Sequence, residues 1–310
     1  MKLKNIIPLL MVAITSCTQN TFVISRKVFC FSVMADVFLY EGKENNLLDI
    51  DDILTEYSNL SDNYESYTGI NNVYSINQTN DEVVVDSKLF DLLKKSFELM
   101  SNATNFNPLL GSLSKKWKEA TANNTTLSNE VINQELEKIN ATSFSFDEDN
   151  LSVQRTGEAE LDLGAVAKGY SLDIVKGYLS EQNIKHYLIN AGNSSLLLGE
   201  KTSDNGYFSV GIKDLNNVYF TAKNCVISTS GNTEQGKHIV NPFTGQLADQ
   251  YDMVVVVSED ASLGDALSTS MMMSSIDEIK ELETSLNVKA IVIKNGSILY
   301  ENSGLGVKRR

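Results

Sequence analysis

Apolar residues recur at helical spacing in several parts of the chain. The first set, Leu47, Ile50, Leu54 and Tyr57, predicts an amphipathic helix. A longer helix is predicted over residues 87–100, with one apolar face formed by Leu89, Leu92, Leu93, Phe97 and Met100. Further helices are predicted over residues 129–139, where Ser128 is placed as the cap, and over residues 165–182, 263–274 and 277–286.

Short runs of alternating or continuous apolar residues predict strands between these helices. They comprise a strand or hairpin over 26–40, a strand at 83–85, two strands within 143–161, and strands near 186–190, 194–199, 207–213, 217–222, 225–229 and 254–257. A closing hairpin is predicted over 290–301, because Asn295-Gly296 favours a two-residue turn. Residues 58–80 are predicted as loops and residues 101–127 as irregular. The mixture lacks regular strand–helix alternation, which indicates an α+β fold.

The N-terminus has the features of an export signal. Lys2 and Lys4 precede an apolar run over residues 6–14, much shorter than the roughly 20 residues of a membrane-spanning helix. Small residues then lead to Cys17, as in a bacterial lipobox, where the cysteine is lipidated and becomes the mature N-terminus. We expect an exported lipoprotein, anchored by acyl chains such as palmitate to a membrane of the cell envelope. The alternative is an ordinary cleaved signal with a chance cysteine.

These features divide the chain into a lipoprotein signal peptide over 1–16, a tether over 17–25 and one domain over 26–305. The formal net charge of −14 disfavours nucleic acids as partners, because an acidic surface repels a phosphate backbone. Export would permit a disulfide between Cys30 and Cys225. Both cysteines lie in apolar, strand-like surroundings, so two buried thiols are favoured.

Two segments combine residues that suit a nucleotide and a metal ion. In residues 162–170, Asp162 and Gly164 are predicted to lie between a strand and a helix, and Lys168 adds charge near the helix N-terminus, where phosphates bind readily. Asp265 and Thr269 are four residues apart and share one helix face, so their oxygen atoms suit magnesium. Taken singly, both segments also fit ordinary helix starts and packing residues.

Two loops and one histidine complete the candidate chemistry. After signal cleavage, only Pro108 and Pro242 would remain, in the motifs Asn105-Phe106-Asn107-Pro108 and Asn241-Pro242-Phe243-Thr244-Gly245. Their placement suggests loops of fixed shape. His238 precedes the second loop and is a candidate general base near neutral pH, whereas His186 begins an apolar strand and is predicted to be structural.

The order of six motifs resembles that of the ApbE family, the FAD:protein FMN transferases. The motifs occupy residues 105–108, 162–170, 190–192, 230–231, 238–245 and 265–269, and the likeness covers roughly residues 28–300. The resemblance implies mixed sheets with packed helices and an FAD cleft between two subdomains. It also implies an Mg²⁺-dependent transfer of FMN from FAD to a Thr or Ser of an exported or membrane redox protein, with release of AMP.

Site roles follow from the same resemblance. It implies that the backbone carbonyl of Ala165 and the side chains of Asp265 and Thr269 bind the metal, and that His238 is the catalytic base. The implied FAD contacts are Met34, Asn105, Phe106, Asn107, Asp162, Lys168 and Ile239.

The chain departs from the family pattern at several motif positions. Met34-Ala35-Asp36 replaces a Met-Gly-Thr type of triplet, Asn193 replaces a second glycine, and Asn241 replaces an aspartate. The Ser-Gly motif is followed by Asn232-Thr233, and the loop before His238 is shortened. Two alternatives therefore stay open beside FMN transfer: Mg²⁺-dependent hydrolysis of FAD to FMN and AMP, and a non-catalytic flavin-binding lipoprotein.

Overall fold

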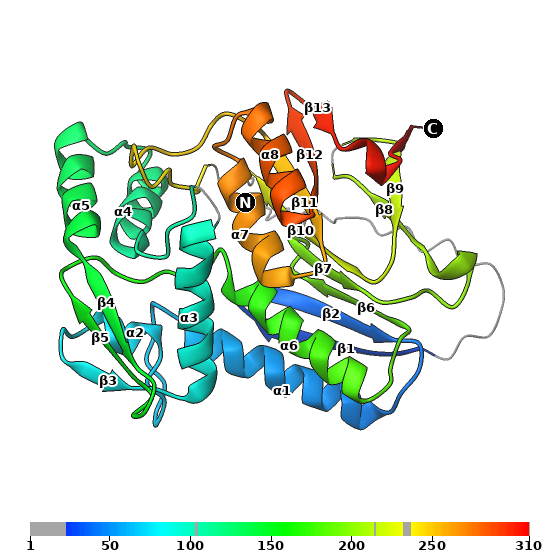
Figure 1. Cartoon of the computed structure of the whole chain (residues 1–310), viewed down its shortest axis with the longest axis horizontal. Coiled ribbons are helices and arrows are strands. Elements are labelled where there is room, and N and C mark those ends of the chain that lie inside the picture. Colours follow the sequence, from blue (N-terminus) through cyan, green and yellow to red (C-terminus); the bar gives the residue numbers. More distant parts are fainter. Residues whose placement is uncertain (1–22, 103–104, 214, 232–236, 310) are drawn as a thin grey trace, which may run out of the picture.

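The computed structural model describes residues 23–102, 105–213, 215–231 and 237–309 (Figure 1). The predicted signal peptide and the lipidation candidate Cys17 lie outside these residues. Within them, no helix combines the length and the apolar content needed to cross a membrane.

An eight-stranded antiparallel sheet forms the centre of the molecule, with the strand order β1-β2-β6-β7-β10-β11-β12-β13. The strands are β1 (Ile24–Cys30), β2 (Val33–Leu39), β6 (Tyr187–Ala191), β7 (Ser195–Leu198), β10 (Cys225–Gly231), β11 (Met253–Ser258), β12 (Lys289–Lys294) and β13 (Ser297–Glu301). Successive side chains of a strand point to opposite faces. Accordingly, Leu197 and Val226 enter one hydrophobic core, and their neighbours Leu196 and Ile227 enter another.

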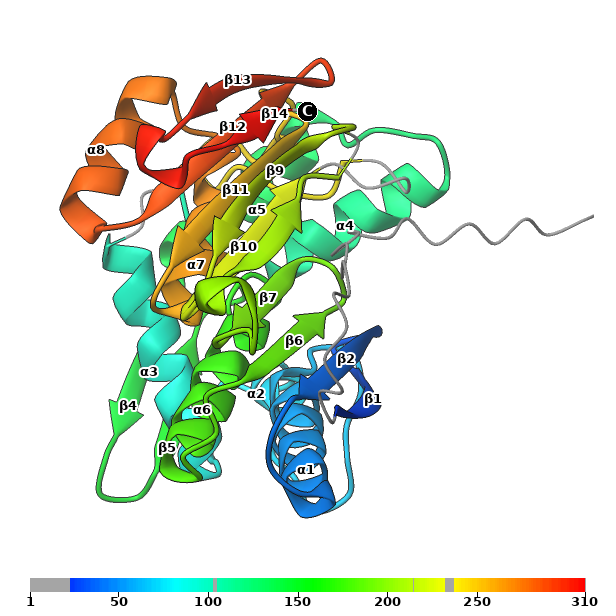
Figure 2. The same ribbon diagram turned by 90° about the vertical axis from the view of Figure 1, so that its right-hand side faces the viewer.

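Helices cover one face of this sheet and a small sheet covers the other (Figures 1 and 2). The helices are α1 (Glu44–Ser61), α6 (Ala167–Glu181), α7 (Ala261–Met271) and α8 (Ile276–Leu286). The small sheet consists of β14 (Lys308–Arg309), β9 (Val218–Ala222) and β8 (Phe208–Gly211). Phe208 and Phe220 of that sheet are buried against the main sheet in the second core.

A second group of elements packs beside α7 and α8 (Figure 1). It contains α2 (Val73–Asn77), β3 (Glu82–Val84), α3 (Ser87–Asn102), α4 (Gly111–Ala122), α5 (Asn129–Ala141), β4 (Ser143–Asp147) and β5 (Ser152–Thr156). β3, β5 and β4 form a three-stranded sheet. Side chains of this group share one core with α7, α8, β11 and β12, so the two parts are packed closely. The α+β class is confirmed.

Most of the predicted elements are present. The 26–40 segment is the β1–β2 hairpin, and the four apolar residues of the first predicted helix are buried in α1. Ser128 caps α5 by accepting a hydrogen bond from the Val131 N–H. Asn295 and Gly296 both have positive φ in the β12–β13 turn, as expected. Cys30 and Cys225 are buried free thiols.

Five local predictions are corrected. Residues 58–80 contain α2, and residues 101–127 contain α4, whose Leu113, Trp117 and Ala120 are buried by tertiary packing that their lysine-rich context did not indicate. Met100 is exposed and Leu99 is buried instead, so the apolar face of α3 is rotated. β1 begins at Ile24, inside the segment predicted as a tether. β5 ends at Thr156, so Asp162 follows an extended segment outside any strand.

That extended segment is held by buried asparagine side chains. Asn77 accepts a hydrogen bond from the Leu161 N–H at 2.8 Å and donates to the Leu161 carbonyl at 3.0 Å, and Asn63 donates to the same carbonyl at 3.4 Å. Arg155, also buried, donates to the Ala159 carbonyl. The backbone N–H and carbonyl groups of Leu161, just before Asp162, are therefore hydrogen-bonded although this segment does not pair with a strand.

We predict that Asn77→Ala lowers the free energy of unfolding by about 2 kcal/mol, because it leaves buried backbone groups of Leu161 without partners. Urea denaturation measures the change. Asn140→Ala, at an exposed position of α5, is the matched control and should change it little. Equal effects of both substitutions would contradict the anchoring role of Asn77.

Candidate active site

The site residues gather at one end of the main sheet. Strand register places Ala35 opposite Ala191 and Ser195 opposite both Ala191 and Ser228. The start of β2, the β6–β7 turn, the start of β7 and the end of β10 therefore lie at the same sheet end. Segments far apart in the sequence are brought together there by antiparallel pairing.

Asp265 is the centre of this end of the sheet. It lies on α7 and is only 7% exposed. Its Oδ1 accepts hydrogen bonds from the hydroxyls of Ser195 at 2.8 Å and Ser228 at 2.7 Å. Its Oδ2 accepts one from the Gly169 N–H at 2.7 Å. The carboxylate thus joins α7 to β7, β10 and the first turn of α6.

Burial raises the pKa of Asp265 above its ordinary value, because a desolvated carboxylate is disfavoured in its charged form. Lys168 and the three hydrogen bonds oppose this shift. Among the described residues, Lys168 supplies the only charge that lowers the pKa of Asp265. A buried carboxylate of this kind is a favourable place for an added cation.

Gly169 permits the close approach of α6 to α7. A Cβ atom at this position would lie 2.2 Å from the Ala261 carbonyl oxygen and 3.0 Å from Cγ of Asp265. The Gly169 N–H donates to Asp265 instead of to the carbonyl of Ala165, four residues earlier. Among the described residues, no hydrogen-bond donor reaches that carbonyl. Its lone pairs are therefore available to a ligand.

Thr269 lies one helical turn after Asp265 and is half-buried. Its Oγ1 is 3.1 Å from Oγ of Ser230, at the end of β10. The Ala165 carbonyl, the Asp265 carboxylate and the Thr269 hydroxyl are all hard oxygen donors, which fit a magnesium ion. The described part of the chain contains no cluster of three or more His, Cys, Asp or Glu side chains suited to a metal, and this donor set has a single carboxylate.

The Asn105–Asn107 segment borders the same region. Asn105 has a φ of +66° and donates to Oγ of Ser274, just beyond α7, at 3.1 Å. Phe106 is buried, and Asn107 accepts a hydrogen bond from the Leu109 N–H at 2.8 Å. The carbonyl of Pro108 accepts from the Asp162 N–H at 2.8 Å. The structure therefore brings two predicted FAD-contact segments side by side.

Asp162 is partly exposed in front of α6. Its Oδ1 accepts a hydrogen bond from the Gly164 N–H at 2.8 Å. Desolvation raises the pKa of Asp162, and the charges of Lys115 and Lys118 oppose the shift. The side chain thus shapes the turn into α6 and stays accessible to a polar ligand.

His238 is exposed and precedes a loop fixed by its own hydrogen bonds. Asn241 accepts from the N–H groups of Phe243 at 2.9 Å and Thr244 at 3.0 Å. An aspartate could accept the same two bonds, so Asn241 preserves the loop shape. The Trp117 indole donates to the Gly245 carbonyl at 2.8 Å, and Ile239 is buried in the core, so the loop is anchored on both sides of its turn.

Met34 is 49% exposed at the start of β2 and pairs with Phe29 of β1. Gly192, in the adjacent β6–β7 turn, has a φ of +65°, and a Cβ there would lie 2.5 Å from Val33. Asn193 follows with a φ of +62°, a conformation that asparagine tolerates better than most residues. Asparagine therefore suits the backbone conformation of this position, where the family pattern has a glycine.

Sequence reasoning missed the residues that surround Asp265. They are Ser195 and Ser228, which are both fully buried. No spacing links these two serines, because only strand register brings them together. Ser230, which belongs to the predicted 230–231 motif, contacts both Ser268 and Thr269. The available sequence indication was the presence of serines in strands that are otherwise apolar.

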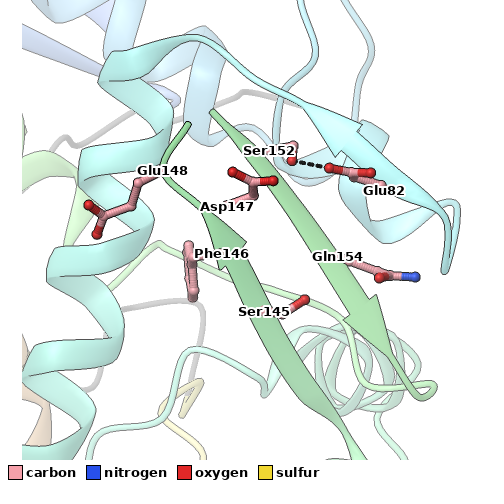
Figure 3. Close-up of a pocket in the computed structure, with 7 residues that line it drawn as sticks. All are labelled: Glu82, Ser145, Phe146, Asp147, Glu148, Ser152 and Gln154. Carbon is pink, nitrogen blue, oxygen red and sulfur yellow. Dashed lines mark hydrogen bonds between the residues drawn. The ribbon is translucent and has the colours of Figure 1, made fainter. Parts of the chain in front are cut away.

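A separate pocket lies over the β3-β5-β4 sheet (Figure 3). Its lining consists of Glu82, Ser145, Phe146, Asp147, Glu148, Ser152 and Gln154. Ser152 donates a hydrogen bond to Glu82. None of the predicted site residues lines it.

Comparison with solved structures gives the class to which this fold belongs. The chain is similar in fold to the flavin transferase ApbE from Vibrio cholerae (17% identity, TM-score 0.74, covering 92% of this chain and 98% of that one). It is also similar to the ApbE protein of Thermotoga maritima (20% identity, TM-score 0.75, covering 93% and 97%). These likenesses establish the fold of a flavin transferase.

Sequence similarity gives the family. The ApbE family model matches residues 31–292. The FAD:protein FMN transferase of Klebsiella pneumoniae is 30% identical over 241 residues, which cover 71% of this chain and 73% of that protein. The chain belongs to the ApbE family, a family of transferases.

We predict that Gly169→Ala lowers the free energy of unfolding by about 1 to 3 kcal/mol, because the added methyl group would collide with the Ala261 carbonyl. Gly177→Ala is a matched control on the same helix, where a Cβ meets nothing within 4 Å. It should raise stability by about 0.5 to 1 kcal/mol through helix propensity. Thermal and urea denaturation measure the stability of both variants. If Gly169→Ala left the free energy of unfolding unchanged, α6 and α7 would not be held in close contact at this position.

Proposed function

We propose that the chain is an Mg²⁺-dependent FAD:protein FMN transferase that attaches FMN through a phosphoester bond to a Thr or Ser and releases AMP. The observation that carries the proposal is the buried Asp265 carboxylate, which lies one turn from Thr269 and accepts a hydrogen bond from the N–H of Gly169, four residues after Ala165. The 30% identical relative named FAD:protein FMN transferase supports the same activity.

The metal would be held by Ala165, Asp265 and Thr269. When bound, Mg²⁺ would neutralise charge on the FAD pyrophosphate and make its phosphorus easier to attack. Asp265 is already oriented by three hydrogen bonds, so little reorganisation is needed when the cation enters.

FAD would contact the segments that border the metal site. Lys168, near the N-terminus of α6, supplies a positive charge for phosphate, and Asp162 offers carboxylate oxygens to a ribose or flavin ring. The Asn105–Asn107 segment, Ile239 and Met34 complete the proposed contacts. Met34 presents an exposed apolar side chain suited to a flavin ring.

His238 would take the proton from the acceptor hydroxyl. The hydroxyl oxygen then forms a bond to the FMN phosphorus, the bond between that phosphorus and the bridging pyrophosphate oxygen breaks, and AMP leaves. The exposure of His238 suits this role, because the acceptor is another protein and must reach the base from outside. We also propose that Cys17 anchors the protein by lipid in the cell envelope, facing an exported or membrane redox protein.

Mass spectrometry of a mixture of the protein, FAD, Mg²⁺ and a Thr-containing acceptor tests the function. Addition of FMN to the acceptor, lost when EDTA removes the metal, is the expected result. Free FMN and AMP without an adduct would make the protein an FAD pyrophosphatase. FAD that stays bound and unchanged would make it a flavin-binding lipoprotein.

We predict that His238→Ala lowers the rate of FMN transfer by roughly 10²- to 10⁴-fold, the contribution of a general base. FAD binding, followed by fluorescence, should change little. His186→Ala is the matched control, because His186 is the only other histidine and its ring contacts the Glu200 carbonyl at 3.1 Å. Comparable transfer rates for the His238 variant and the wild type would remove His238 from the mechanism.

A further inference from the structure

The acceptor positions of the Asp265 carboxylate are unequally occupied. A carboxylate has about four lone-pair positions, two on each oxygen. Ser195 and Ser228 use both positions of Oδ1, and Gly169 uses one of Oδ2. No donor among the described residues uses the fourth position, on Oδ2, which is left for a cation.

We propose that Ser195 and Ser228 form a clamp that restricts Asp265 to binding a cation through one oxygen, and that this clamp makes the site select magnesium over calcium. The inference rests on the proposed function, since it concerns the same metal site. Ser195 and Ser228 act through Asp265 and are positioning residues.

The selectivity follows from the coordination habits of the two ions. Calcium takes six to eight oxygen ligands and commonly uses both oxygens of a carboxylate, whereas magnesium is octahedral and binds carboxylates through single oxygens. A carboxylate whose second oxygen is saturated by hydroxyl groups suits magnesium. Calcium would have to displace at least one serine hydroxyl to obtain a bidentate ligand.

The surroundings of the clamp resist such a displacement. Ser195 and Ser228 are opposite each other in the β7–β10 ladder, and both are fully buried. Gly264 brings α7 so close that a Cβ there would lie 2.9 Å from Oγ of Ser228. The Ser228 hydroxyl therefore has little room to turn away from Asp265.

Metal binding to the full chain tests the clamp directly. Electron paramagnetic resonance counts free Mn²⁺ in a titration, with and without FAD, and competition with Mg²⁺ and Ca²⁺ gives the ratio of their affinities. We expect the wild type to prefer Mg²⁺, and Ser195→Ala, Ser228→Ala and the double variant to shift the ratio toward Ca²⁺ by about tenfold or more. Asp265→Asn should abolish Mn²⁺ binding.

Two controls separate positioning from simple packing. Ser96→Ala removes an equally buried hydroxyl, bonded to the Leu92 carbonyl of α3, and should leave the ratio unchanged. Ser195→Thr keeps the hydroxyl and should keep the magnesium preference. If the double variant does not fold, the single variants still test the clamp, because each of them frees one lone-pair position on Oδ1 of Asp265.

The possible failures are distinguishable. An unchanged Mg²⁺-to-Ca²⁺ ratio in variants that bind Mn²⁺, or equal loss of both metals, would overturn the clamp and leave the FMN transfer proposal standing. A wild-type protein that binds no Mn²⁺ in either titration would overturn the metal site and the clamp together.

Discussion

The burial of one carboxylate constrains the whole site. Asp265 can stay in the interior only if its oxygens are hydrogen-bonded or neutralised by a cation, since an isolated buried charge is strongly unfavourable. Its donors come from β7, β10 and α6, three elements separated by long stretches of sequence. The antiparallel pairing of β7 with β10 and the contact of α6 with α7 are therefore preconditions for a stable Asp265, and the main fold and the site stabilise each other.

The two sides of the site are built differently. On the Asp265 side, regular strands and helices meet at glycines, where Gly169 and Gly264 allow contacts that a Cβ would prevent. The other side consists of segments without regular structure around residues 105–108, 159–165 and 238–245. Their backbone groups are satisfied partly by the asparagine side chains of Asn77, Asn107 and Asn241. Irregular backbone of this kind can be rigid and still present N–H and carbonyl groups to a ligand.

Much of the fold was predictable because local patterns carry it. The β1–β2 hairpin, the Ser128 cap and the Asn295-Gly296 turn each depend on neighbours within a few residues. α4 was missed because its helical face is marked by only three buried residues amid lysines, and its stability comes from packing against distant elements. Asp265 and Thr269 could be proposed as site residues from their spacing together with the family resemblance. Ser195 and Ser228 could not be identified from the sequence, because their contact with Asp265 depends on strand register, which a short motif does not reveal.

The departures of this chain from the family pattern also depend on local backbone shape. Asn193 adopts the positive φ expected of the glycine that it replaces, and Asn241 accepts the two N–H bonds that an aspartate would accept. Asparagine therefore suits the backbone conformation that this chain has at both positions. If a motif residue serves to set the backbone conformation, another residue with a similar conformational preference can replace it. Asp265 and Thr269, whose side-chain oxygens are the proposed metal ligands, are both present at the positions that the resemblance implies.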